Sequence, residues 1–203
     1  MTGGPLVPLA SPEDWDGRLP AVLVARAAGR AERRALLRAL AARVLGLASD
    51  AVALRFDEGA PPCLVRPEWA GLHLSSGSRD GLAAVAVADR PVGVDLERVT
   101  ADEPPWNVLH PDEARALRAL EHGERAFALA RLWSVKEAYL KALGTGLSRE
   151  PGSFLVQGAE HGSATIRDGD QLTLARTAWL GHEPAYALAL VTTAPCSPPP
   201  SSS

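Results

Sequence analysis

Apolar residues in the first half of the chain follow one helical pattern and several short patterns typical of strands. Residues 31–47 carry leucine and valine at helical spacing between arginines, which predicts an amphipathic helix that ends near Gly46. The residues before Leu19 are rich in proline and glycine and are expected to form a loose lead-in. Short apolar runs predict strands at 21–26, 51–56 and 82–88, with a proline- and glycine-rich loop at 59–67.

The second half shows a similar alternation. An apolar run at 91–97 predicts a strand, and His110-Pro-Asp-Glu113 is typical of a helix start, because proline and acidic residues suit the first turn. That helix is expected to run to about residue 120, and a longer one covers 124–143 and is closed by the glycines at 144 and 146. Later apolar runs predict strands at 153–157, 164–167, 172–179 and 186–192.

This order of elements predicts an α+β fold with two similar halves. We assign residues 1–90 to the first half and 91–193 to the second, with a disordered tail rich in proline and serine at 194–203. In each half a helix that ends in Leu-Gly, at 45–46 and at 143–144, precedes a strand. The repeat is faint, but it favours one α+β unit in each half.

Composition excludes several classes of protein. The chain has 203 residues, of which 46% are hydrophobic and 22% charged, which is enough for a packed core and excludes a disordered chain. Its 21 basic and 24 acidic residues give a net charge of -3, which argues against a nucleic-acid partner. No apolar run reaches the roughly 20 residues of a membrane span and the first residues do not resemble a signal peptide, so no membrane partner and a cytoplasmic location are expected. Cys63 and Cys196 are too far apart in sequence to suggest a disulfide framework or a cysteine metal site.

Two carboxylates lie two positions apart on the strand predicted at 91–97. Asp95 and Glu97 should project from the same face of the strand, while Val94 and Leu96 are buried behind them. Two carboxylates this close repel each other unless a cation lies between them, and Mg²⁺ is the cation that best suits oxygen ligands beside a phosphate. The alternative is a solvated acidic face on an edge strand.

The long helix carries a second charged group. Glu137 and Lys141 lie one turn apart on the side opposite an apolar face, and the chain's only two lysines, Lys136 and Lys141, both fall in this helix. The alternative is an exposed pair that contributes a few tenths of a kcal/mol to helix stability. Together, three carboxylates and two lysines suit a Mg²⁺-dependent attack on a phosphate.

Two motifs carry a family resemblance. Val92-Gly-Val-Asp-Leu-Glu97 resembles the Gly-x-Asp-x-Glu motif of the Sfp-type 4'-phosphopantetheinyl transferases. Leu132-Trp-Ser-Val-Lys-Glu-Ala-Tyr-Leu-Lys141 resembles the Trp-Ser-x-Lys-Glu-x-x-x-Lys motif of the same family, and His110-Pro-Asp-Glu113 resembles the helix start between the two. The likeness extends from about residue 51 to residue 147.

The resemblance implies a pseudo-twofold arrangement of two α+β halves with the active site between them. It implies transfer of 4'-phosphopantetheine from coenzyme A to a serine of an acyl or peptidyl carrier protein of polyketide, fatty-acid or nonribosomal peptide synthesis. By position, Asp95, Glu97 and Glu137 would hold Mg²⁺, and Glu137 would also help to deprotonate the serine. Lys141 would stabilise the departing phosphate oxygen and Lys136 would support the phosphates, and a monomer is expected.

Two positions depart from the family pattern. The chain has Gly59-Ala60-Pro61 where the family usually has Gly-Lys-Pro or Gly-Arg-Pro, and Ser75-Ser76 where it usually has Ser-His. Ser75 and Ser76 are still expected at the coenzyme A site, and arginines could replace the missing groups, the candidates being Arg30, Arg33, Arg34, Arg66 and Arg79. The departures leave two alternatives open: an enzyme with an altered donor or changed chemistry, and a non-catalytic module that binds a carrier protein.

Overall fold

The computed structural model describes residues 6–68, 71–158, 162–181 and 184–194. The tail predicted at 194–203 therefore lies outside the described residues, except for Ala194. Within these ranges no helix is long and apolar enough to cross a membrane.

The first half is a small sheet covered by one helix. Its antiparallel strands have the order β1-β5-β4, and a separate two-stranded hairpin, β2-β3, lies beside them. Helix α1 ends at Gly46, whose φ of 67° is readily adopted by glycine. The elements are β1 (Ala21–Arg26), α1 (Arg30–Leu45), β2 (Ala53–Arg55), β3 (Cys63–Arg66), β4 (His73–Arg79) and β5 (Leu82–Ala88).

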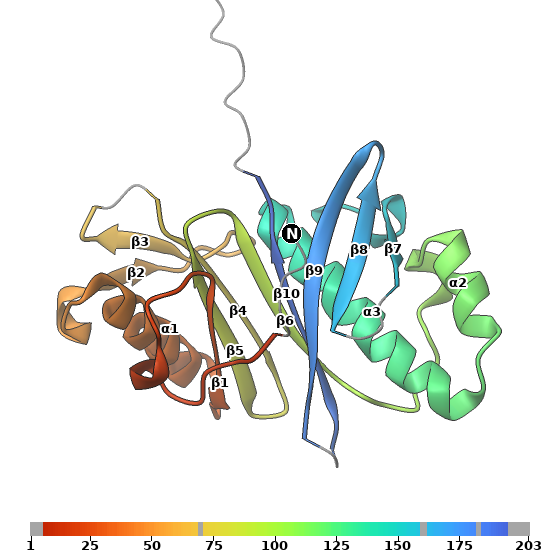
Figure 1. Ribbon diagram of the computed structural model, residues 1–203, viewed down its shortest axis with the longest axis horizontal. Helices are drawn as coiled ribbons and strands as arrows, with labels where there is room; N and C mark the ends of the chain where they lie inside the picture. The colour runs from red at the N-terminus through yellow and green to blue at the C-terminus, as the bar shows by residue number, and fades with distance from the viewer. Residues whose placement is uncertain (1–5, 69–70, 159–161, 182–183, 195–203) are drawn as a thin grey trace, which may run out of the picture.

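The second half is a five-stranded antiparallel sheet with the order β6-β10-β9-β8-β7. Helix α3 packs along β6 and β10, and the short helix α2 lies beyond the first turns of α3 (Figure 1). The elements are β6 (Val92–Arg98), α2 (Pro111–Arg118), α3 (His122–Leu143), β7 (Leu155–Gln157), β8 (Ser163–Asp168), β9 (Gln171–Leu180) and β10 (Tyr186–Thr192).

Three apolar clusters hold these layers together. One lies between α1 and the first sheet, one between α3 and the second sheet, and one joins the two sheets to each other. The two halves share a strand order. In each, the strand that comes last in sequence lies between the first strand and the next-to-last one, as β5 does in β1-β5-β4 and β10 does in β6-β10-β9. The α+β fold is thus confirmed, and the shared strand order supports a pseudo-twofold arrangement, which itself stays a prediction.

Most predicted elements are present, with three corrections in the first half. The loop predicted at 59–67 contains strand β3, and the strand predicted at 51–56 is shorter because a 3₁₀ turn covers Ser49–Ala51. The lead-in is not loose, since Leu6 is buried and Leu9 bridges to Leu23. Strand β3 is four residues long, lies between Pro62 and Pro67 and pairs with β2 in a two-stranded sheet, so turn-forming residues obscure its short apolar run.

A glycine allows β6 and α3 to approach closely. A Cβ at Gly93 would lie 1.8 Å from the Ala138 carbonyl oxygen and 2.7 Å from the Ala142 nitrogen, both in the backbone of α3. Gly93→Ala is expected to lower the free energy of unfolding by about 2–3 kcal/mol, because helix backbone cannot rotate away as a side chain could. Urea denaturation measures this.

The matched control is Gly123→Ala in the first turn of α3, where a Cβ would meet nothing within 4 Å. There alanine should change stability by no more than about 1 kcal/mol, in the stabilising direction. Equal stability changes in the two variants would show that the close approach at Gly93 is not required.

Candidate functional site

The packing of α3 on β6 brings four of the predicted residues together. Asp95 and Glu97 face α3 from β6, and the Lys141 ammonium lies 2.7 Å from Asp95 Oδ1 and donates to the Val94 carbonyl over 3.3 Å. Asp95 is only 6% exposed, so the alternative of a solvated acidic face is wrong. Lys141 forms its ion pair with Asp95 on β6 and not with Glu137 on its own helix, which argues against the alternative of an exposed Glu137–Lys141 pair.

A fifth charged residue joins this group from β4. The Arg79 guanidinium donates to Glu97 Oε2 from Nε over 3.0 Å and also from Nη2. Two cations therefore face three carboxylates at the junction of β4, β6 and α3. Gly77 leaves room for the contact between strands, since a Cβ there would lie 3.0 Å from Asp95 Oδ1.

The carboxylates influence one another electrostatically. Burial raises the pKa of Glu137, and the negative charges of Asp95 and Glu97 raise it further. Burial also raises the pKa of Glu97, with a smaller contribution from Asp95, although the hydrogen bond from Arg79 opposes the change. A cation placed among these groups would favour their ionised forms.

Two observations test whether the three carboxylates suit a Mg²⁺ ion. Asp95 Oδ2 is buried and has no hydrogen-bond partner, and such an oxygen is costly unless something binds it. In the described part of the chain, however, no group of three histidine, cysteine or acidic side chains is close enough together to hold a metal ion in the present conformation. The residues fit Mg²⁺ in ligand type and charge, and side-chain movement would be needed to gather them around it.

A basic cavity of about 510 Å³ opens beside Lys141. The first turns of α1 contribute Arg30, Arg33 and Arg34, and the positive end of the helix dipole lies at the same place. The Arg34 guanidinium stacks over the Phe56 ring at 4.4 Å from its centroid. The other lining residues are Asp57, Glu58, Gly59, Ala60, Pro61, Pro62, Ser75, Ser76, Gly144 and Gly146.

The predicted serines and two further arginines lie in different surroundings. Both Ser75 and Ser76 line the cavity, but the Ser75 hydroxyl also accepts a hydrogen bond from the Val94 N–H over 3.0 Å and so ties β4 to β6. Arg66 is not among the cavity residues, and Arg79 binds Glu97. Three of the five candidate arginines are thus placed to meet an anion in the cavity.

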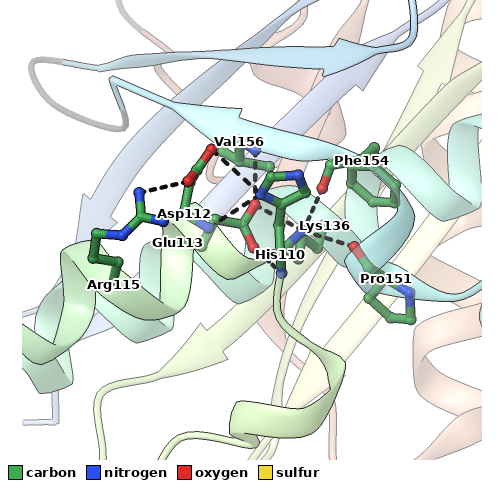
Figure 2. Close-up of polar contacts among 8 residues, drawn as sticks. All are labelled: His110, Asp112, Glu113, Arg115, Lys136, Pro151, Phe154 and Val156. Carbon is green, nitrogen blue, oxygen red and sulfur yellow. Dashed lines mark hydrogen bonds and ion pairs between the residues drawn. The ribbon is translucent and has the colours of Figure 1, made fainter.

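Lys136 lies elsewhere, and its predicted role in supporting phosphates is wrong. Its side chain is fully buried, and its ammonium lies 2.8 Å from Glu113 Oε1 (Figure 2). It also donates to the carbonyls of Pro151 and Phe154 over 2.7 and 3.0 Å. Protein acceptors thus use all three of its N–H bonds.

Glu113, the partner of Lys136, was predicted only as an acidic residue in the first turn of a helix, and its ion pair with Lys136 was missed. Its Oε1 also accepts the Val156 N–H over 2.7 Å, and its Oε2 accepts the His110 N–H over 3.0 Å, which closes a capping box at the start of α2. The bond from the His110 N–H to Glu113 could have been predicted from sequence, because a residue at the helix start and an acidic residue three positions later form a capping box. Neither the pair with Lys136 nor the bond from Arg79 to Glu97 has a local sequence signal, because each joins distant elements.

Several known proteins are similar to this chain. The profile of the 4'-phosphopantetheinyl transferase superfamily matches residues 91–191. The 4'-phosphopantetheinyl transferase HetI of Nostoc sp. is 30% identical over 162 residues, which cover 70% of this chain and 68% of that protein. A holo-[acyl-carrier-protein] synthase of Geobacillus kaustophilus is 33% identical over 108 residues, covering 48% of this chain and 81% of the synthase.

Other relatives are considerably longer than the matched region. A 4'-phosphopantetheinyl transferase of Bacillus subtilis is 27% identical over 153 residues, which cover 74% of this chain and 63% of the relative. For similar transferases of Bacillus pumilus and Aneurinibacillus migulanus, the matched share of the relative is 49% and 50%. The chain therefore spans about half to somewhat under two thirds of the length of these three proteins.

Proposed function

Since the chain belongs to the 4'-phosphopantetheinyl transferase superfamily, we propose that it transfers 4'-phosphopantetheine from coenzyme A to a serine of an acyl or peptidyl carrier protein. The observation that carries this proposal is the group formed by Asp95, Glu97, Glu137 and Lys141 at the edge of a basic cavity. The serine oxygen bonds to the phosphorus of the phosphopantetheine, the bond from that phosphorus to the leaving oxygen breaks, and 3',5'-ADP departs.

Each charged residue has a distinct proposed role. Asp95, Glu97 and Glu137 would hold Mg²⁺, which when bound neutralises charge on the pyrophosphate. Glu137 accepts the serine proton, a role supported by its position one helical turn from Lys141 on the same helix. Lys141 donates a hydrogen bond to the departing phosphate oxygen, and its ammonium already lies at the cavity wall.

The cavity supports coenzyme A as the donor despite Ala60 and Ser76. Arg30, Arg33 and Arg34 supply positive charge at a helix N-terminus, where phosphate groups bind favourably. Because these arginines come from the first half and Lys141 from the second, the site also supports our proposal that residues 1–90 and 91–193 form two related halves with the active site between them.

The α1 arginines are expected to bind the phosphates of coenzyme A, and substitutions of Arg30 and Arg33 test this role. Arg30→Gln and Arg33→Gln should each weaken coenzyme A binding by about 1.5–3 kcal/mol, which is roughly ten- to a hundredfold, because each removes a charge-assisted contact to a phosphate. Calorimetric titration of coenzyme A measures the effect. Arg38→Gln is the matched control, since Arg38 is an exposed arginine of the same helix outside the cavity. Unchanged binding in both cavity variants would contradict the assignment.

A second candidate, an altered donor, is favoured by one observation: Ala60 and Ser76 both line the cavity and carry no charge. If the donor lacks the 3'-phosphate, dephospho-coenzyme A should bind as tightly as coenzyme A. Restoring the usual groups with Ala60→Lys and Ser76→His should then leave use of that donor unimproved. For a coenzyme A enzyme, the same changes should tighten coenzyme A binding, most clearly at low salt.

The experiment that tests the proposed reaction measures 3',5'-ADP in mixtures of the chain, coenzyme A, Mg²⁺ and apo carrier proteins. Release of 3',5'-ADP that depends on the carrier is expected. A non-catalytic binding module would retain the carrier protein without releasing 3',5'-ADP.

A further inference from the structure

The ion pair between Arg79 and Glu97 joins an accessible cation to a sheltered carboxylate. The Arg79 side chain is 47% exposed, whereas the Glu97 side chain is 13% exposed. Both Nε and Nη2 of Arg79 donate to the same carboxylate oxygen, Oε2. The guanidinium therefore reaches from the solvent side of β4 to an acidic group on β6.

The other cation of the group is held differently. Lys141 is 27% exposed, and it donates both to Asp95 Oδ1 and to the Val94 carbonyl, so it is anchored at two points. It also leaves Asp95 Oδ2 without a partner. A metal ion could therefore bind Asp95 Oδ2 while Lys141 stays in place. At Glu97, Oε2 becomes available only when Arg79 leaves, so a metal ion that uses both carboxylate oxygens must displace it.

We propose that Arg79 is an internal counter-ion that occupies Glu97 until a divalent cation displaces it, and that Arg79 thereby lowers the affinity of the site for that cation. This inference rests on the metal site of the proposed function. Two physical effects support it. The Arg79 side chain is 47% exposed, so water can solvate the guanidinium when it leaves Glu97, and a guanidinium beside the site repels a doubly charged ion.

The same pair explains why the acidic side chains are not gathered around a common point. With Arg79 on Glu97 and Lys141 on Asp95, two of the three carboxylates already have a cation of their own. Opening the Arg79 pair frees Glu97 to turn toward Asp95 and Glu137. A divalent cation thus replaces the Arg79 guanidinium at Glu97, and the metal site is not preformed.

The test titrates Mn²⁺ alone into the full chain by calorimetry, without coenzyme A. Arg79→Gln should bind Mn²⁺ about five- to tenfold more tightly than the unaltered chain, because both the competitor and its charge are lost. Arg79→Lys keeps the charge and should change the affinity less. Thermal unfolding gives a second measurement, in which Mn²⁺ should raise the midpoint of Arg79→Gln more than that of the unaltered chain.

Arg98→Gln is the matched control. The Arg98 side chain is also 47% exposed, and it pairs with a carboxylate, Asp80, at 3.2 Å. Its Mn²⁺ affinity should equal that of the unaltered chain. If Arg79→Gln binds Mn²⁺ no more tightly than the unaltered chain, or only as Arg98→Gln does, the inference is overturned.

A further variant separates failure of this inference from failure of the proposed function. Glu137→Gln should weaken Mn²⁺ binding both in the unaltered chain and in Arg79→Gln. If Glu137→Gln weakens binding while Arg79→Gln does not tighten it, the counter-ion role is wrong and the metal site stands. If Glu137→Gln changes neither, the proposed metal site is itself wrong, and the inference falls with it.

Discussion

Replacing Glu137 by glutamine is expected to lower the rate of phosphopantetheine transfer by a factor of about 10²–10⁴, the range associated with loss of a general base. The amide cannot accept the serine proton, and it is a weaker ligand for a divalent cation than a carboxylate. The rate of 3',5'-ADP release at saturating Mg²⁺ measures the effect. Glutamine keeps the size of the side chain, so the half-buried position should remain packed.

The control for this variant lies on the same helix. Glu124 is exposed and outside the carboxylate group, and Glu124→Gln should leave the transfer rate unchanged. Thermal unfolding of both variants establishes that the chain is folded. Near-normal turnover of Glu137→Gln at saturating Mg²⁺ would show that Glu137 is neither the base nor a required metal ligand.

Lys136→Met is expected to have the largest effect on stability, a loss of about 3–5 kcal/mol in the free energy of unfolding. The change removes the counter-charge of Glu113, whose side chain is only 2% exposed, and it leaves the carbonyls of Pro151 and Phe154 without a donor. Urea denaturation near neutral pH measures the loss. Coenzyme A affinity of the folded fraction should stay unchanged, because Lys136 does not line the cavity.

Two comparisons make this prediction specific. The double variant Glu113→Gln with Lys136→Met should recover part of the loss, since no buried charge remains unpaired. Arg55→Gln opens an exposed pair, in which Arg55 and Asp57 are 63% and 55% exposed, and it should cost less than about 1 kcal/mol. A loss below 1 kcal/mol for Lys136→Met would mean that the buried pair contributes no more than a surface pair.

Local periodicity was sufficient to predict the charged faces of the site. The two-residue spacing of Asp95 and Glu97 and the one-turn spacing of Glu137 and Lys141 are properties of single elements, so they can be read from sequence. The contact between those elements depends on Gly93, whose missing side chain lets α3 lie against β6.

The environment of Lys136 could not be predicted from helical periodicity. A helical wheel assumes one buried face, but α3 contacts the sheet and helix α2, and its Lys136 also contacts the segment before β7. Lys136 is fully buried, and so is Ser134, although Ser134 lies within one turn of the site residue Glu137. A lysine one position from a site residue therefore lies about 100° around the helix, toward Glu113 instead of the cavity.

The most direct test of the central claim is the intact mass of an apo carrier protein after incubation with the chain, coenzyme A and Mg²⁺. We expect a mass increase of one phosphopantetheine, which disappears when the acceptor serine of the carrier is replaced by alanine or when Glu137→Gln is used. Unchanged mass across a panel of acyl and peptidyl carrier proteins, with a folded chain and saturating coenzyme A, would contradict the proposed reaction.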